Sequence, residues 1–452
     1  MKVAVGVGWM VALCFATSST LANDKPPVSS APVSSTAQPL AASEEGPKDE
    51  LPERKTEWAA LPIISGSADT GFSVGASAII TGAGGDAKPY RWQIELIAAP
   101  AFKGGPRGFE VTEHHYGAAI DVPQLFGTRL RYSLKLYYTL TRNEVYFGLG
   151  NDAIPDPHSV TQDVLGKSQY VSEEIRARNL LRFPLLSRSD GANQANETWT
   201  GLLGLQLRGA SFTPYPGSKL ESDIAQSGPD GRPYTYPRTA GLNFVLTPSL
   251  GVAYDTRDNE VFAQTGLFWE ASARFAFVAP EVAASHAGAN VTVRQYLKLA
   301  DHTVLASRLV VDSIFGKAPF YDLADYGSFS PVEAIGGAAG VRGIPVGLYM
   351  GRLKAFGNIE FRTMPILTKL FGSPLRLGAD VFFDAGRSWM NYTFDDVRDG
   401  KGLGIRWGVG GGILVQYGSA ALFRLEAAYA PQARIANPGF PLAIYLTDDL
   451  AF

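Results

Sequence analysis

The chain has 452 residues and a formal net charge of −3, so it lacks the basic excess that nucleic-acid binding requires. Glycine (49), phenylalanine (25) and tyrosine (19) are abundant and only 18% of the residues are charged, a composition typical of a β-barrel rather than of a helical protein. The mean hydropathy of +0.00 argues against a helical membrane protein, but it is expected of strands that have one face in water.

Residues 1–22 have the pattern of a secretory signal peptide. Lys2 precedes an apolar run that ends at Ala16, and small residues precede the expected cleavage after Ala22. The apolar run is too short to favour a transmembrane anchor. The single cysteine, Cys14, lies inside this segment, so the mature chain would carry no disulfide, no cysteine-zinc site and no cysteine nucleophile.

Residues 23–57 are rich in proline, serine, alanine and acidic residues, which predicts a disordered periplasmic linker. No later apolar run reaches the length of about 18 residues that a transmembrane helix needs. Residues 58–452 instead alternate between polar and apolar side chains with a period of two. We therefore expect one further domain over 58–452, an outer-membrane β-barrel.

The alternation is clearest in long segments such as 130–140, 242–256 and 405–416. A soluble β-sandwich would also alternate, but its strands are usually shorter than these runs, which have the length of a tilted membrane-crossing strand. Several charged residues share the more polar face of their strands, and this predicts a water-filled lumen rather than a packed core. They are Arg131, Lys135, Lys354, Glu360, Arg362, Arg424 and Glu426.

The pattern predicts an all-β fold, a 16-stranded antiparallel transmembrane β-barrel. Several connections after odd-numbered strands are long, as expected of extracellular loops, and the even count would place both chain ends in the periplasm. The expected strands are 58–65, 70–82, 90–100, 108–121, 128–142, 171–184, 197–212, 242–256, 264–278, 290–299, 303–313, 352–363, 374–386, 403–417, 420–430 and 443–452.

The last expected strand ends in an aromatic residue, Phe452, which shares its face with Leu450. This ending resembles the signal that the outer-membrane barrel assembly machinery reads during biogenesis. Asp448 interrupts the apolar face at a position where that signal usually has an apolar residue. Outer-membrane lipid and the assembly machinery are therefore the expected partners.

Three motifs carry a resemblance to a known family. They are Val341-Arg342-Gly343, the run from Phe382 to Gly386, and the turn Asp255-Thr-Arg-Asp-Asn259 followed by Thr265-Gly266. They resemble the barrel of the BamA and TamA superfamily, also called bacterial surface antigens, and the most specific part is the order and spacing of Val341-Arg342-Gly343, then Asn358-x-Glu360-x-Arg362, then Phe382 to Gly386. The resemblance implies that residues 314–351 form an extracellular loop six that folds inward. It also implies a short member, because the linker 23–57 is too small to hold the POTRA domains that usually precede the barrel.

The same resemblance implies a latch between loop six and the lumen wall. Val341, Arg342 and Gly343 would form its loop side, and the glycines at 336, 337, 340 and 343 would let the loop fold tightly. Asp384 faces the lumen by strand parity and would accept from the Arg342 fork. Two alternatives stay open: Arg342 is a solvated loop residue, or the pair serves folding only. The remaining wall partners are Glu360 as second acceptor, Arg362 as its counter-charge, Phe382 and Gly386.

Other chemistry has little support in the sequence. The five histidines show no metal-ligand spacing, and no phosphate-binding, dinucleotide-binding or serine-nucleophile motif occurs. We expect no catalytic residue, no cofactor and no metal. The glycines between Gly408 and Gly412 lie in an expected strand, where they favour a close approach of another backbone or a bend of the barrel.

The leading functional hypothesis is a non-enzymatic barrel that inserts or translocates protein or lipid at the outer membrane of a Gram-negative bacterium, for a client that is not identified. Its mechanism would use a weak seam between the first and last strands. Two alternatives remain: a passive channel or structural surface protein, and a barrel-embedded hydrolase.

Overall fold

The computed structural model describes most of the chain from Thr56 onward. The described ranges are 56–67, 70–82, 90–105, 107–153, 160–188, 196–226, 242–259, 262–280, 282–329, 332–333, 335–370, 373–392, 399–417, 421–436 and 442–447. The predicted signal peptide, most of the predicted linker, and Leu450 and Phe452 of the predicted assembly signal lie outside them.

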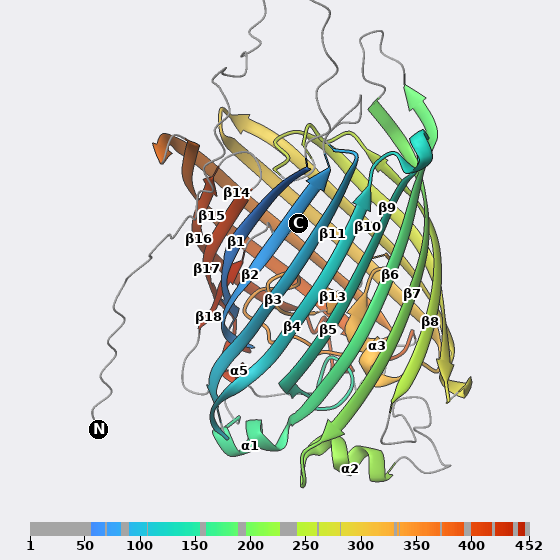
Figure 1. Ribbon diagram of the computed structural model, residues 1–452. Coiled ribbons are helices and arrows are strands. Elements are labelled where there is room, and N and C mark those ends of the chain that lie inside the picture. Colours follow the sequence, from blue (N-terminus) through green and yellow to red (C-terminus); the bar gives the residue numbers. More distant parts are fainter. Residues whose placement is uncertain are drawn as a thin grey trace, which may run out of the picture.

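The described chain folds into a closed antiparallel barrel of 16 strands (Figure 1). Each strand pairs with its neighbour in the chain, and β11 pairs directly with β14. The barrel strands are β1 (Thr56–Ser67), β2 (Gly71–Gly82), β3 (Trp92–Gly105), β4 (Gly108–Val122), β5 (Arg131–Val145), β6 (Gln169–Arg188), β7 (Asn196–Pro214), β8 (Asn243–Asp255), β9 (Gly266–Ala279), β10 (His286–Ala300), β11 (Thr303–Gly316), β14 (Leu353–Leu370), β15 (Ser373–Trp389), β16 (Arg406–Tyr417), β17 (Ala421–Tyr429) and β18 (Leu442–Thr447).

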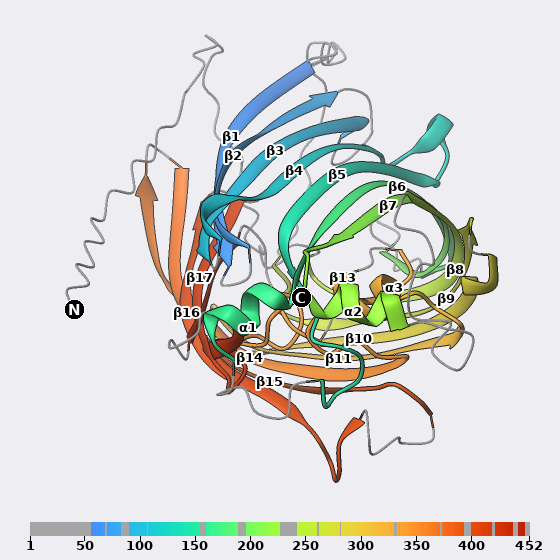
Figure 2. The same cartoon turned by 90° about the horizontal axis from the view of Figure 1, so that it is seen from below.

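The connections hold short elements. Between β11 and β14 lie a helix and a separate two-stranded sheet, α3 (Phe320–Ala324), β12 (Asp325–Tyr326) and β13 (Val332–Glu333). The others are η1 (Leu125–Gly127), α1 (Gln162–Lys167), α2 (Lys219–Gln226), η3 (Val282–Ala284) and α5 (Ala433–Ala436). Figures 1 and 2 show α1 and α2 at the same end of the barrel. We call this the long-connection end, and the opposite one the short-turn end. Within the described residues, none of the helices has the length and apolar character needed to span a membrane.

Strand parity separates the two faces of the wall. On β15 the outward Val381 and Phe383 are 59% and 49% exposed, whereas Phe382 and Asp384 between them are buried. This outward apolar face is what lipid contact requires. The prediction of a water-filled lumen is wrong around five of the predicted inward charges on β14 to β17, because each of them is at most 2% exposed. They are Lys354, Glu360, Arg362, Arg424 and Glu426.

The barrel closes through its shortest strand pairing among the described residues. β1 pairs with β2 along its whole length, from Thr56 opposite Gly82 to Ser67 opposite Gly71. Against β18 the described register holds Gly66 opposite Leu446 and Ser67 opposite Tyr445. Fewer ladder hydrogen bonds therefore join β1 to β18 than join β1 to β2, within the described part of both strands.

Candidate functional site

The connection between β11 and β14, residues 317–352, contacts inward-facing side chains of the wall. Viewed along the barrel, α3 and β13 lie within the outline of the strands (Figure 2). Many of its apolar side chains are fully buried, among them Phe320, Ile335, Val341, Ile344 and Leu348. We call this connection the β11–β14 segment. Three sets of polar contacts fix it to different strands.

The first set surrounds Arg342, whose side chain is 0% exposed. Its Nε donates to Asp384 Oδ2 at 2.7 Å and its Nη2 donates to Asp384 Oδ1 at 2.9 Å, so the pair is bidentate. Its Nη1 donates to Glu426 Oε1 at 2.9 Å. Glu360 Oε1 lies 2.7 Å from Nη2 as an ion pair outside hydrogen-bond geometry. We call these four residues the Arg342 cluster.

Two of its three carboxylates have a second arginine on their own strand. Arg362 Nε donates to Glu360 Oε2 at 2.6 Å on β14. Arg424 Nη1 donates to both oxygens of Glu426 at 3.0 Å on β17. These partners are two residues apart, which places both side chains on the inward face of one strand. Among the described residues, Asp384 has no arginine other than Arg342 within ion-pair distance.

Burial and charge oppose one another at Arg342. Burial alone would lower the pKa of the guanidinium, but Glu360, Asp384 and Glu426 outweigh it and raise that pKa well above its usual range. The side chain therefore stays charged, and the cluster is stable only while its charges remain paired.

In the motif from Phe382 to Gly386 on β15, every second residue faces inward and has its own role at the site. The ring of Phe382 lies under the guanidinium, with Cζ of Arg342 3.4 Å from the ring centroid. Asp384, two residues on, accepts the fork. A Cβ on Gly386 would meet Phe356 Cβ at 2.4 Å, so only glycine leaves room for Phe356 on the neighbouring strand. The inward face of β15 thus supplies a ring that stacks on the guanidinium, a carboxylate that accepts from it, and a position without a side chain.

The backbone around Arg342 lies directly on the wall. The Arg342 N–H donates to Asp384 Oδ2 at 3.1 Å, and the Gly343 N–H donates to Tyr445 Oη of β18 at 3.0 Å. Gly343 has φ +95°, which favours glycine. A Cβ on Gly408 of β16 would lie 1.9 Å from the Arg342 carbonyl oxygen. The interpretation of this glycine as a point of close backbone approach is therefore confirmed.

The second set of contacts lies at α3 and was not predicted from the sequence. Arg208 of β7 donates through Nη1 to Asp322 Oδ1 at 2.7 Å, and through Nη2 to Glu174 of β6. Its Cζ lies 4.7 Å from the centroid of the Tyr321 ring. Arg176 balances Glu174 at 2.5 Å. Inward charges on β6 and β7 were the only sequence signal, and they do not reveal a partner in a connection more than a hundred residues later.

The third set lies between the other two. Arg274 of β9 forms a bidentate pair with Asp312 of β11, with both distances 2.8 Å. Asp312 also accepts from the Gly327 N–H at 3.0 Å. Lys354 of β14 donates to the carbonyl oxygens of Leu323 and Gly351, each at 3.0 Å. The β11–β14 segment is thus tied to strands on well-separated parts of the ring, from β6 and β7 to β15, β17 and β18.

The arrangement holds the β11–β14 segment against the wall of the barrel. The three carboxylates of the Arg342 cluster are all engaged with arginines. In the described part of the chain, no group of three or more histidine, cysteine, aspartate or glutamate residues is placed to hold a metal ion.

Comparison with known proteins identifies the family. The Omp85 superfamily domain matches residues 109–439. The chain belongs to the Omp85 superfamily. This is a family of insertases and translocases whose 16-stranded barrel implies an outer membrane, and its barrels are generally non-enzymatic. The sequence matches no curated protein.

Solved structures show the same fold at low sequence identity. A crystal structure of BamA from Haemophilus ducreyi lacking POTRA domains 1-3 has a TM-score of 0.54 and 13% identity, over 87% of this chain and 70% of that one. CdiB from Escherichia coli has a TM-score of 0.52 and 12% identity, over 88% of this chain and 63% of that one. This Omp85 barrel thus spans less than two thirds of the CdiB chain.

All the predicted wall residues of this Omp85 barrel face inward and are buried or tightly packed. Arg342 meets Asp384 and Glu360, Phe382 lies beneath it, and Arg362 pairs with Glu360. Val341 is 0% exposed, packed among apolar residues of the β11–β14 segment. Glu426 and Tyr445 were missed as partners of this segment, although Glu426 was recognised as an inward charge.

Proposed function

We propose that this Omp85 barrel inserts or translocates protein or lipid in the outer membrane of a Gram-negative bacterium, by opening between β1 and β18 rather than by conducting through its lumen. In this proposal the β11–β14 segment is an extracellular loop six folded inward, and the Arg342 cluster is the latch that holds it. The long-connection end then faces outward and the short-turn end faces the periplasm.

The observation that carries the proposal is the Arg342 cluster itself. A buried arginine held by Asp384 and Glu426, with Glu360 beside it, fixes the β11–β14 segment across the lumen. A passive pore needs an open path, and a segment tied to strands on separate parts of the ring obstructs one. The seam where the barrel closes, between β1 and β18, supplies the alternative route, and these strands share two register pairs among the described residues.

A disulfide across the seam tests the route. Continuing the register by one residue beyond Gly66 opposite Leu446 would bring Ser65 opposite Thr447, and Cys14 is the only cysteine of the sequence. The S65C/T447C protein would be reconstituted in liposomes, oxidised or reduced. Two activities would be measured: folding of a small denatured outer-membrane barrel, and transfer of a fluorescent phospholipid between leaflets.

We expect at least one activity in the reduced protein and its loss on oxidation. The matched control joins two strands away from the seam, A119C/K135C, where Ala119 and Lys135 are register partners on β4 and β5. Oxidation there should leave the activity unchanged. Full activity of the oxidised seam variant, or no activity in the reduced protein, would contradict the proposal.

A further inference from the structure

A buried histidine of β10 faces the anchor at α3. His286 is the first residue of β10, at the long-connection end, and its side chain is only 2% exposed. Its register partners on the neighbouring strands are Ala276 of β9 and Gly316 of β11, which carry a methyl group and no side chain. The imidazole therefore meets no bulky neighbour on the inward face of the sheet and reaches toward Asp322 of α3.

One hydrogen bond decides which ring nitrogen of His286 carries a proton. Nδ1 lies 3.0 Å from the carbonyl oxygen of Ala284. A carbonyl oxygen can only accept, so Nδ1 is the donor and holds a proton in the neutral ring as well as in the charged one. In the neutral ring, Nε2 is consequently an acceptor.

This second nitrogen faces a carboxylate. Nε2 lies 3.6 Å from Oδ2 of Asp322, whose Oδ1 accepts from Arg208 at 2.7 Å. Oδ2 is buried, and no donor among the described residues forms a hydrogen bond with it. A neutral His286 thus sets one acceptor against another. A proton on Nε2 turns the same contact into a charge-assisted pair of donor and acceptor.

The charges that surround this contact are balanced while His286 is neutral. Among the described residues, four largely buried carboxylates are joined by ion pairs to four basic side chains from six strands of the wall and of the β11–β14 segment. The carboxylates are Glu174 of β6, Asp312 of β11, Asp322 of α3 and Asp325 of β12. The basic side chains are Arg176 of β6, Arg208 of β7, Arg274 of β9 and Lys354 of β14.

The nearby helix α2 does not disturb this balance. Its Asp223 is paired with Lys219 and accepts from the phenol of Tyr146 at 3.1 Å. Neither form of the imidazole is therefore imposed by an excess of charge, and His286 can gain or lose its proton as the pH changes.

We propose that the His286–Asp322 contact is a pH-sensitive anchor, which holds α3 and the β11–β14 segment more firmly against the wall when His286 is protonated. Histidine is the side chain whose charge ordinarily changes between about pH 5 and 8. In acid the charged ring donates to Asp322 Oδ2 and adds β10 to the strands that hold α3. When the proton leaves, two acceptors face each other and Arg208 remains as the ion-pair partner of Asp322. The stabilisation is thus present at low pH and is lost as the pH rises.

Limited proteolysis of the full-length barrel in detergent, at about pH 5.5 and about pH 8, tests this anchor. The protease has broad specificity and is active at both pH values, and cleavage around α3 is mapped by mass spectrometry. The cleavage rate of each variant is divided by that of the unchanged protein at the same pH, so that the pH dependence of the protease cancels. For His286→Leu we expect a ratio of roughly three or more at the lower pH and of one or less at the higher pH.

A second substitution tests whether Asp322 is the partner. Asp322→Asn removes the charge with which His286 would pair, so adding His286→Leu to Asp322→Asn should change the cleavage rate little at either pH. Heat-modifiable migration on gels verifies that each variant is folded. If His286→Leu does not fold, His286→Gln takes its place, because it keeps a polar side chain without a charge at either pH and should show the same trend.

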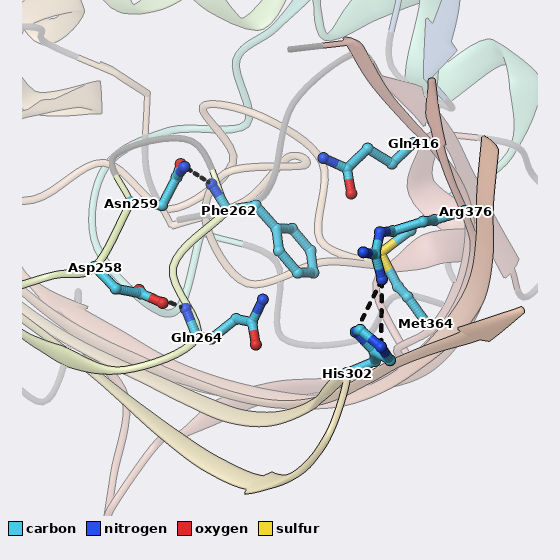
Figure 3. A pocket seen from close by; sticks show the side chains of 8 residues that line it. All are labelled: Asp258, Asn259, Phe262, Gln264, His302, Met364, Arg376 and Gln416. Atoms are coloured by element: carbon cyan, nitrogen blue, oxygen red, sulfur yellow. Dashed lines mark hydrogen bonds between the residues drawn. The ribbon is translucent and has the colours of Figure 1, made fainter. Parts of the chain in front are cut away.

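The matched control is His302→Asn, at the opposite end of the barrel. His302 lies at a small cavity of the short-turn end, where its Nδ1 is 2.9 Å from Nη1 of Arg376 (Figure 3). It faces a cation rather than a carboxylate, and asparagine tolerates its φ of +63°. Its cleavage ratio around α3 should stay close to one at both pH values.

Three outcomes would overturn the proposal. They are a His286→Leu ratio that does not change with pH, a ratio that falls in acid, and a ratio that keeps its full pH dependence in the Asp322→Asn background. Cleavage is measured without a client or transport, so this result is independent of the seam experiment.

Discussion

Removal of Arg342 would affect Asp384 most, because the other two carboxylates of the Arg342 cluster each keep a second arginine. Glu360 retains Arg362 at 2.6 Å and Glu426 retains Arg424 at 3.0 Å when Arg342 is removed. Asp384 would be left charged, buried and without an arginine. The contribution of the cluster to folding stability therefore depends chiefly on the Arg342–Asp384 pair, although Arg342 also contacts two other carboxylates.

This asymmetry predicts the outcome of a double-mutant cycle. Arg342→Met should destabilise the barrel by about 3–5 kcal/mol, the usual cost of leaving one charge of a buried pair uncompensated. Asp384→Leu should cost less, since Arg342 keeps Glu360 and Glu426. The double variant should be more stable than the sum of the single effects implies. Equilibrium denaturant unfolding in detergent measures all three free energies.

Lys369→Met serves as the control, because it removes a positive charge from an exposed position of the same strand as Glu360. Its effect should stay within about 0.5 kcal/mol. Strictly additive effects of Arg342→Met and Asp384→Leu would show that the two side chains are not coupled and that their short contacts contribute little to folding.

At the scale of elements, the alternation of polar and apolar residues predicted every barrel strand, but some ends differ. β14 was expected to end at 363 and continues to Leu370. Pro365 lacks a backbone N–H, and the register shifts between Thr363 and Ile366, so the polar-apolar alternation is interrupted there. An interrupted alternation looks like the end of a strand, although the chain stays in the sheet beyond the bulge.

The candidate site was likewise predicted only in part from the sequence. Arg342 and Asp384 were paired through the family resemblance of two motifs that lie 42 positions apart. Arg208 and Asp322 are separated by 114 positions and carry no motif. Their meeting depends on how the ring of strands closes and how the β11–β14 segment crosses it, and neither follows from local periodicity.

The anchor at α3 can be tested separately from the Arg342 cluster. Asp322→Asn removes one charge while Arg208 keeps Glu174, so the cost should be about 1–3 kcal/mol. Cleavage by added protease should increase around α3, with little change near Arg342, because the contacts to Asp384 remain. The cleavage sites can be mapped by mass spectrometry.

Asp301→Asn is the matched control for this charge removal. Asp301 lies in a turn with its side chain 88% exposed and paired only with Lys298 among the described residues, a surface contact that is worth little. It should change neither stability nor cleavage. Equal cleavage around α3 in the Asp322→Asn and unchanged proteins would mean that this anchor does not hold the helix.

At the scale of the whole molecule, the lumen is obstructed from two directions. The β11–β14 segment reaches from β6 and β7 to β15 and β17, and the β8–β9 connection brings Phe262 against β14, β16 and β17 at the short-turn end. The wall from β14 to β17 is therefore braced from inside at two levels.

Removal of the β11–β14 segment should convert the closed barrel into a pore. Gly316 ends β11 and Leu353 begins β14, which are adjacent antiparallel strands, so a short glycine-serine linker can replace residues 318–351. In planar bilayers the unchanged protein should show no large steady conductance, and the deletion should show one. Adding Phe262→Ala to the deletion should raise the conductance further, because that ring narrows the short-turn end.

The double variant Arg342→Met and Asp384→Leu, recorded in the same planar bilayers, tests whether the Arg342–Asp384 pair alone keeps the lumen closed or whether the whole β11–β14 segment does. Loss of the pair alone should give brief openings, since the anchors at Arg208 and Asp312 still hold the segment in place. A steady conductance in the unchanged protein that this double variant leaves intact would instead describe a passive channel. A deletion variant that folds and stays closed would show that the segment is not what obstructs the lumen.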